Sequence, residues 1–160
     1  MESQLVVLSA ILKLIVDKKQ VESLLTQLPE EAKPLPDDKY HVTLMHQYFA
    51  AALREQLKVT PKEDYTLCWQ AHPDAQNEYG DPEAILGERI YRIDRPAQKR
   101  SSWIVLCKNQ RELGRYVNRV CYKYGLPPNP EPYRVYHVSL ANLSGNPFHS
   151  VGDVDVSDLA

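Results

Sequence analysis

The 160-residue chain is poor in the residue types that mark several specialised classes of protein. It has three cysteines, an odd number without a Cys-x-x-Cys pair, so neither a disulfide framework nor a zinc ribbon is expected. Cys68, Cys107 and Cys121 lie in apolar contexts, which is typical of core thiols in a reducing compartment. Six glycines and twelve prolines are enough to mark turns, and they form no low-complexity tract.

The chain also lacks an excess of charge and a long apolar run. Its 19 basic and 21 acidic residues give a net charge of −2, whereas a protein that grips duplex nucleic acid usually has a basic excess. The apolar run from Leu5 to Val16 is interrupted by Lys13 and is shorter than the ~20 residues that span a bilayer. Because Glu2 stands where a signal peptide carries positive charge, we expect a buried strand in a cytoplasmic protein without membrane contact.

What the chain does contain is a duplicated motif. The sequence Tyr-His-Val-Thr-Leu at residues 40–44 returns as Tyr-His-Val-Ser-Leu at residues 136–140. In a strand, side chains i and i+2 share a face, so His41 lies beside Thr43, and His137 beside Ser139. Each copy therefore presents an imidazole and a hydroxyl on an otherwise apolar strand, and coincidence is a poor explanation for two such copies.

The segments before the two motifs also correspond. An apolar run at residues 5–12 is followed by apolar residues at helical spacing over 21–28, and then by the first motif. A second apolar run at 103–107 is followed by helical spacing over 113–124, and then by the second motif. The sequence thus predicts an α+β fold with two related β-α-β lobes, in one domain that covers residues 1–160.

Local signals define further elements. Asn109 and Glu112 have the spacing of a capping box, and Gly125 stands where the same helix should end. The remaining expectations are a helix over 46–58, strands over 65–71 and 88–94, a loop over 73–82, a turn at 145–147 and a short last strand over 151–156.

The paired motifs resemble those of the two-histidine phosphoesterase superfamily. That group includes LigT-like RNA cyclic phosphodiesterases, eukaryotic cyclic phosphodiesterases and phage enzymes that destroy cyclic oligonucleotide signals. The resemblance covers residues 5–143, with the second histidine 96 positions after the first. It implies two pseudo-symmetric β-α-β lobes whose antiparallel sheets face a central cleft. Ser139 departs from the more usual threonine but keeps the hydroxyl.

The chemistry of phosphodiester cleavage suits these residues. One group must take a proton from water or a ribose hydroxyl, and another must protonate the leaving oxygen. Two imidazoles with pKa values near ~6.5 can share this work at neutral pH, and hydroxyls can stabilise charge on the phosphate. The resemblance implies that His41 and His137 act as base and acid in an unassigned order, with Thr43 and Ser139 on the phosphate, and that no metal or cofactor takes part.

Several substrates and functions fit this pattern. The preferred expectation is hydrolysis of small or cyclic oligonucleotides, because residues 33–41 also resemble the approach in phage anti-CBASS enzymes, which act in the host cytoplasm. The alternatives are opening of RNA 2′,3′-cyclic phosphate ends, a non-catalytic nucleotide-binding module, and a structural protein in which the motifs only pack. The expected partner is a small nucleotide or an RNA end, and neither duplex nucleic acid nor a membrane.

Other residues are candidates for substrate contacts. Trp69, Trp103 and Tyr133 could stack on bases, although such rings also occur in ordinary interfaces. Arg92 and Arg95 belong to a basic stretch that continues to Lys99 and Arg100; this stretch could hold a second phosphate or be a solvated face. Tyr40 and Tyr136 should point away from the motif side chains and pack. A metal site at His41, His46 and His137 is disfavoured, since no carboxylate or thiolate stands at ligand spacing.

Overall fold

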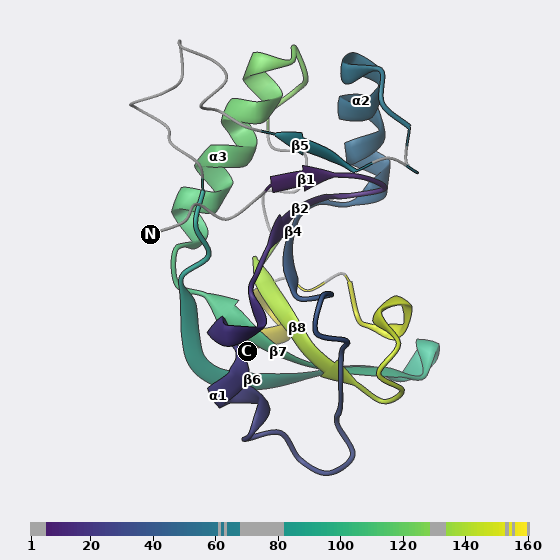
Figure 1. The fold of residues 1–160 in the computed structure, drawn as a ribbon, viewed down its shortest axis with the longest axis vertical. Coiled ribbons are helices and arrows are strands. Elements are labelled where there is room, and N and C mark those ends of the chain that lie inside the picture. The colour runs from purple at the N-terminus through teal and green to yellow at the C-terminus, as the bar shows by residue number, and fades with distance from the viewer. Residues whose placement is uncertain are drawn as a thin grey trace. The chain divides into compact units, whose positions relative to one another are not determined.

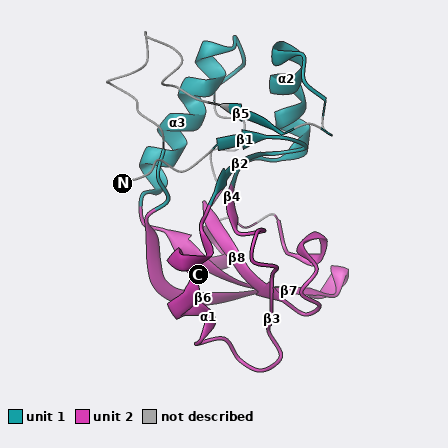
Figure 2. Cartoon of the chain, viewed as in Figure 1, with its two compact units in different colours: residues 1–15, 43–84, 109–132 teal, residues 16–42, 85–108, 133–160 magenta. Residues whose placement is uncertain are grey.

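The computed structural model describes residues 6–60, 62, 64–67, 82–128, 134–152, 154 and 156–159. The described residues form an α+β fold, as predicted, with eight strands in an open antiparallel sheet and three α-helices (Figure 1). The strand order is β5-β1-β2-β4-β8-β7-β6, and β3 pairs with β8 outside this path. The chain divides into two compact units, residues 1–15, 43–84 and 109–132 and residues 16–42, 85–108 and 133–160 (Figure 2).

The first unit begins with a hairpin of β1 (Val6–Leu8) and β2 (Leu12–Ile15). A single strand was predicted here, and that prediction is wrong. The chain reverses between Ser9 and Ile11, where the Ser9 N–H donates to the Ile11 carbonyl at 2.9 Å. Arg54 stabilises the reversal by donating to the carbonyl oxygens of Ser9 at 3.0 Å and Ala10 at 2.7 Å. Because most residues from Val6 to Ile15 are apolar, sequence periodicity does not show this turn. The strand β5 (Tyr65–Leu67) pairs with the other edge of β1.

Two helices complete the first unit. The helix α2 (Gln47–Leu57) follows the first motif as predicted and buries Ala50 and Leu53. The helix α3 (Gln110–Lys123) begins after Asn109, but the capping box is not formed, because the Asn109 amide donates to the Glu112 carboxylate at 2.9 Å. As predicted, Gly125 stands just past the end of α3, and its φ of 70° is the left-handed conformation that glycine adopts most easily.

The second unit contains the long hairpin of β6 (Leu86–Arg95) and β7 (Arg100–Cys107), and β7 also pairs with β8 (His137–Asn142). The short strand β3 (Lys33–Pro34) pairs with β8 as well. The helix predicted over 21–28 is only one turn, α1 (Glu22–Leu25), preceded by a 3₁₀ turn over Lys18–Gln20. The strand β4 (His41–Met45) begins in this unit and continues into the first.

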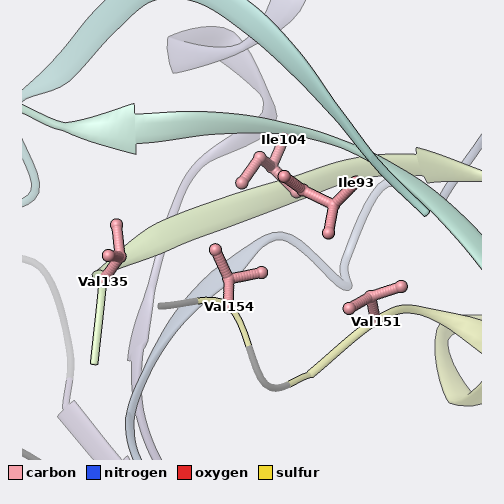
Figure 3. Packing of buried hydrophobic residues seen from close by; sticks show 5 residues of the cluster. All are labelled: Ile93, Ile104, Val135, Val151 and Val154. Carbon is pink, nitrogen blue, oxygen red and sulfur yellow. The ribbon is translucent and has the colours of Figure 1, made fainter. Parts of the chain in front are cut away.

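The C-terminal segment packs on one face of the β6–β7–β8 ladder. Val151 and Val154 meet Ile93, Ile104 and Val135 in a buried cluster (Figure 3). The backbone N–H of Val135 donates to the Val154 carbonyl at 3.2 Å, which fixes the segment beside β8. The described residues of 151–156 form no strand, so that prediction is wrong; a 3₁₀ turn over Val156–Leu159 follows.

Both halves of the chain repeat one order of elements. In each half of the chain the order is hairpin, helix, motif strand: β1–β2, α1, β4 in the first half and β6–β7, α3, β8 in the second. The compact units do not coincide with these halves, since α3 belongs to the first unit whereas β7 and β8 belong to the second. None of the helices in the described ranges has the length and apolar content to cross a membrane.

Candidate functional site

The two motif strands are direct neighbours, because β4 and β8 pair antiparallel with Val42 opposite Val138. In such a register the flanking residues point to the other face, so His41 lies across from Ser139. Strand alternation places His137 on the same face of β8 as Ser139, and Thr43 on the same face of β4 as His41. Three predicted catalytic side chains, those of His41, His137 and Ser139, therefore share one face of the β4–β8 ladder in the second unit.

The opposite face explains why this register forms. Val42, Val138 and Val105 are fully buried in a row across β4, β8 and β7. A slip of one residue would move these β-branched side chains to the other face and bury the polar ones in their place. The apolar half of each motif thus fixes the position of the polar half.

Both motif histidines are held in the same way. His41 Nδ1 lies 2.9 Å from the Lys39 carbonyl oxygen, and His137 Nδ1 lies 2.8 Å from the Val135 carbonyl oxygen. A carbonyl only accepts hydrogen bonds, so Nδ1 must carry the proton in each ring. In the neutral imidazole the lone pair then belongs to Nε2. Each motif therefore selects the tautomer in which Nε2 can take a proton.

The residues before the histidines anchor the strands, as predicted. Tyr40 is 1% exposed and Tyr136 is 4% exposed. The Tyr40 hydroxyl donates to the Leu35 carbonyl at 3.0 Å, and burial raises the pKa of this phenol. Both tyrosines are packing residues, and they leave the imidazoles on the other face of their strands.

A β-bulge directly follows Ser139. Ser139 is opposite Ile104 on β7, but the next pair joins Ala141 with Trp103, so Leu140 is an extra residue in β8. A bulge bends its strand and redirects the side chains beside it. The Leu140 carbonyl is not left unpaired, because it accepts from the Leu35 N–H at 3.1 Å. The motif alternates regularly up to Leu140, so sequence reasoning did not predict this bulge.

Asn142 is a second feature that sequence reasoning missed. Its side chain is fully buried, and its amide donates to the Asn146 carbonyl at 2.7 Å and the Ser150 hydroxyl at 3.0 Å. Its side-chain oxygen accepts from the backbone N–H groups of Ser144 at 3.0 Å and Gly145 at 2.6 Å. Asn142 thereby shapes the loop after β8. The segment Asn142-Leu143-Ser144-Gly145-Asn146-Pro147 was the available signal, because such residues form side-chain-stabilised turns.

The base-stacking candidates are not gathered at this site. Trp103 is 3% exposed and packs with Ala32 and Ala141, while the Arg92 guanidinium lies 5.0 Å from its ring centroid. Its ring has almost no accessible surface for a base. The assignment of Trp103 to base stacking is therefore replaced by a role in the core. Trp69 and Tyr133 lie outside the described residues.

The two candidate arginines are matched by carboxylates. Arg92 lies 3.0 Å from the Asp94 carboxylate and 3.5 Å from that of Glu31. Its positive charge helps to lower the pKa of Asp94, after the larger effect of the Ser101 hydroxyl bonded to the same carboxylate. Arg95 pairs with Asp158 at 2.8 Å, and both of these side chains are mostly buried. A phosphate at either arginine would have to compete with a carboxylate already in place.

The other histidines have separate positions. His46 is the N-cap residue of α2, and His149 lies 2.7 Å from the Ser144 hydroxyl, measured from Nδ1. Among the described residues, no three His, Cys, Asp or Glu side chains are grouped as a metal site would require. Cys107 and Cys121 are buried thiols, whereas Cys68 and His72 lie outside the described residues. Burial raises the pKa of the Cys107 thiol to about 12.

Comparison with protein-family models, with curated proteins and with solved structures finds no match to this chain.

Proposed function

We propose that the protein is a metal-independent phosphodiesterase that hydrolyses phosphodiester bonds of small or cyclic oligonucleotides. The observation that supports this most directly is the duplicated tether: two histidines, each with Nδ1 bound to a carbonyl two residues earlier, on neighbouring strands and beside a hydroxyl. A histidine with only a structural role needs no such duplicate, whereas a site with two proton-transfer groups needs two histidines held in this way.

The tethers suit a two-histidine mechanism. One neutral ring would take a proton from the attacking water or ribose hydroxyl through Nε2, while the other ring, protonated, would give its Nε2 proton to the leaving oxygen. Nδ1 stays a donor to its carbonyl in both protonation states, so a ring can change its charge without turning. Thr43 and Ser139 would donate to the non-bridging phosphate oxygens, where negative charge increases in the transition state.

The family proposed for this chain is the two-histidine phosphoesterase superfamily. Its support is the motif pair together with the repeated order hairpin, helix, motif strand. The Val42–Val138 pair lies at the centre of the two motifs, with His41 across from Ser139, which is the arrangement expected if the halves are related by pseudo-two-fold symmetry. The two-lobed fold with a central cleft is part of this proposal.

Short or cyclic oligonucleotides are the proposed substrates because the net charge of −2 gives no general attraction for long nucleic acid. Opening of RNA 2′,3′-cyclic phosphate ends is the competing reaction, since it needs the same two proton transfers. Turnover of a substrate distinguishes either reaction from a binding module without catalytic activity.

The test is incubation of the protein with cyclic di- and trinucleotides, 2′-5′ oligoadenylates and RNA ending in a 2′,3′-cyclic phosphate, with products identified by mass spectrometry. We expect cleavage of at least one diester, retained in EDTA, with a bell-shaped pH dependence. His46→Gln is the matched control, because it removes a histidine that caps a helix and should keep the wild-type rate. Absence of any turnover would exclude the enzyme, and loss of activity in EDTA with recovery on added zinc would exclude the metal-free mechanism.

A further inference from the structure

The basic stretch that continues β6 into β7 divides into two parts with different surroundings. Arg92 and Arg95 are paired with carboxylates, as described above. Lys99 and Arg100 are not: within the described part of the chain, neither forms an ion pair with a carboxylate. The positive charge available to an anion therefore lies at the turn between β6 and β7.

This turn forms one wall of a hollow of about 340 Å³ in the second unit. Residues 98–101 line it on one side, and Leu143, Ser144 and His149 line it on the other. Among the described residues that line it, none is acidic, and the cationic donors are the Lys99 ammonium and the Arg100 guanidinium. Asn142 holds the loop that carries Ser144 through five hydrogen bonds, so the second wall is shaped before a ligand arrives.

One residue that lines the hollow, Arg100, lies on the same face of β7 as Ile104. Arg100, Ser102 and Ile104 share one face of β7, because they are two residues apart along the strand. Arg100 donates to the Ser150 carbonyl at 3.4 Å, and the Ser102 hydroxyl accepts from the Val151 N–H at 2.7 Å. Ile104 belongs to the same buried cluster as Val151. Ile104 is also the direct partner of Ser139. Arg100 is four residues farther along β7, which corresponds to roughly 13 Å at the rise of a β-strand.

We propose that this hollow binds a second phosphate of an oligonucleotide whose scissile phosphate lies at His41, His137 and Ser139. The inference rests on the proposed function for the position of the scissile group. At roughly 13 Å, one phosphate cannot reach both places. The protein would thus select substrates with more than one phosphate over a mononucleotide, and Lys99 and Arg100, not Arg92 and Arg95, would make the selection.

The experiment measures affinity, so it does not depend on turnover. Calorimetry with the His137→Ala variant would give Kd values for 2′,3′-cyclic AMP and for a triadenylate that ends in the same cyclic phosphate. Adding Lys99→Gln and Arg100→Gln should weaken triadenylate binding about tenfold or more, because charge-assisted hydrogen bonds are lost, and should change the mononucleotide Kd much less. The salt dependence of log Kd for the triadenylate should fall by about 0.7 per lost phosphate contact.

Two further variants control this test. The pair Arg111→Gln and Arg115→Gln removes the same charge from the exposed side of α3 and should leave the ratio of the two Kd values unchanged. Lys99→Asn is the fallback if the double variant does not fold, because asparagine tolerates the left-handed backbone at this position, where φ is 56°. This single variant should weaken triadenylate binding less than the double variant. Equal loss for both ligands, or no loss for the triadenylate, would overturn the proposal. Failure of the proposed function would instead appear as a wild-type protein that cleaves no diester.

Discussion

The two motif strands repeat one local sequence in two different environments. His41 and His137 have the same carbonyl tether, the same neighbouring hydroxyl and the same preceding tyrosine. Yet His137 is 6% exposed, whereas His41 is half-buried. His137 has β7 beside it, where Leu106 is its direct partner, and Val135, two residues earlier in the chain, belongs to the cluster under the C-terminal segment.

The difference teaches that the motif determines the orientation of the imidazole, while the neighbouring elements determine its burial. The tether spans two residues and needs only strand backbone, so it forms in both copies. Burial around the second motif involves β7 and the cluster of Val151 and Val154, which are distant from the first motif in sequence. We therefore expect the two histidines to be equivalent in proton transfer but unequal in their contribution to stability.

The largest expected effect concerns activity. His41→Ala and His137→Ala should each lower kcat for diester hydrolysis by about 10²–10⁴-fold, because each removes a proton-transfer group. The double variant should lose little more than the worse single variant, since the two rings act as a unit. Rate measurements on the cleaved diester check this. A wild-type rate in either single variant would remove that histidine from the mechanism and break the functional equivalence of the motifs.

The hydroxyls should have a smaller effect. Ser139→Ala and Thr43→Val each remove one hydrogen bond to a charged phosphate, so we expect a decrease in kcat of about 10–100-fold. Ser139→Thr restores the hydroxyl and should recover most of the activity. Comparing kcat with KM is informative here, because loss of a contact made only in the transition state lowers kcat and leaves KM nearly constant. An increase in KM alone would assign the hydroxyls to substrate binding.

Stability should separate the two histidines. His137→Ala removes a buried ring and leaves the Val135 carbonyl without its donor, which should cost about 1–3 kcal/mol and lower Tm by roughly 3–10 °C. His41→Ala acts at a half-buried position and should cost at most about 0.5 kcal/mol. Thermal unfolding of both variants at one pH tests this. Equal Tm values would show that the environments differ less than their exposure indicates.

The smallest effect is a change in thiol reactivity beside β8. Since burial raises the pKa of Cys107 to about 12, only about one thiol in 10⁴ is ionised at pH 8, and the wild-type protein should react slowly with iodoacetamide at this residue. The Cys107 N–H donates to the Tyr136 carbonyl at 3.1 Å, one residue before His137. Mass spectrometry should therefore find faster labelling of Cys107 in His137→Ala than in His41→Ala, and the reverse order would contradict the comparison.

Much of the secondary structure could be predicted where the pattern is local. The helix over Gln47–Leu57, the end of α3 before Gly125 and the strand around residues 88–94 follow from apolar spacing and turn residues. The hairpin at Val6–Ile15 could not, because most of its residues are apolar and the reversal is held by Arg54 from a distant helix. The predicted length of the helix over residues 21–28 was wrong for another reason, because apolar spacing does not show how many helical turns will form.

The same division holds for the candidate site. By itself, the sequence determined the pairing of each imidazole with a hydroxyl, since strand alternation places residues i and i+2 together and alternation is a property of the backbone. The tertiary structure decided that β4 and β8 are neighbours, that Ser139 precedes a bulge, and that Trp103 is buried. It also decided which cations are matched by carboxylates, because Arg95 meets Asp158 and Arg92 meets Glu31 only in the folded chain. Such contacts join residues far apart in sequence, and no local pattern encodes them.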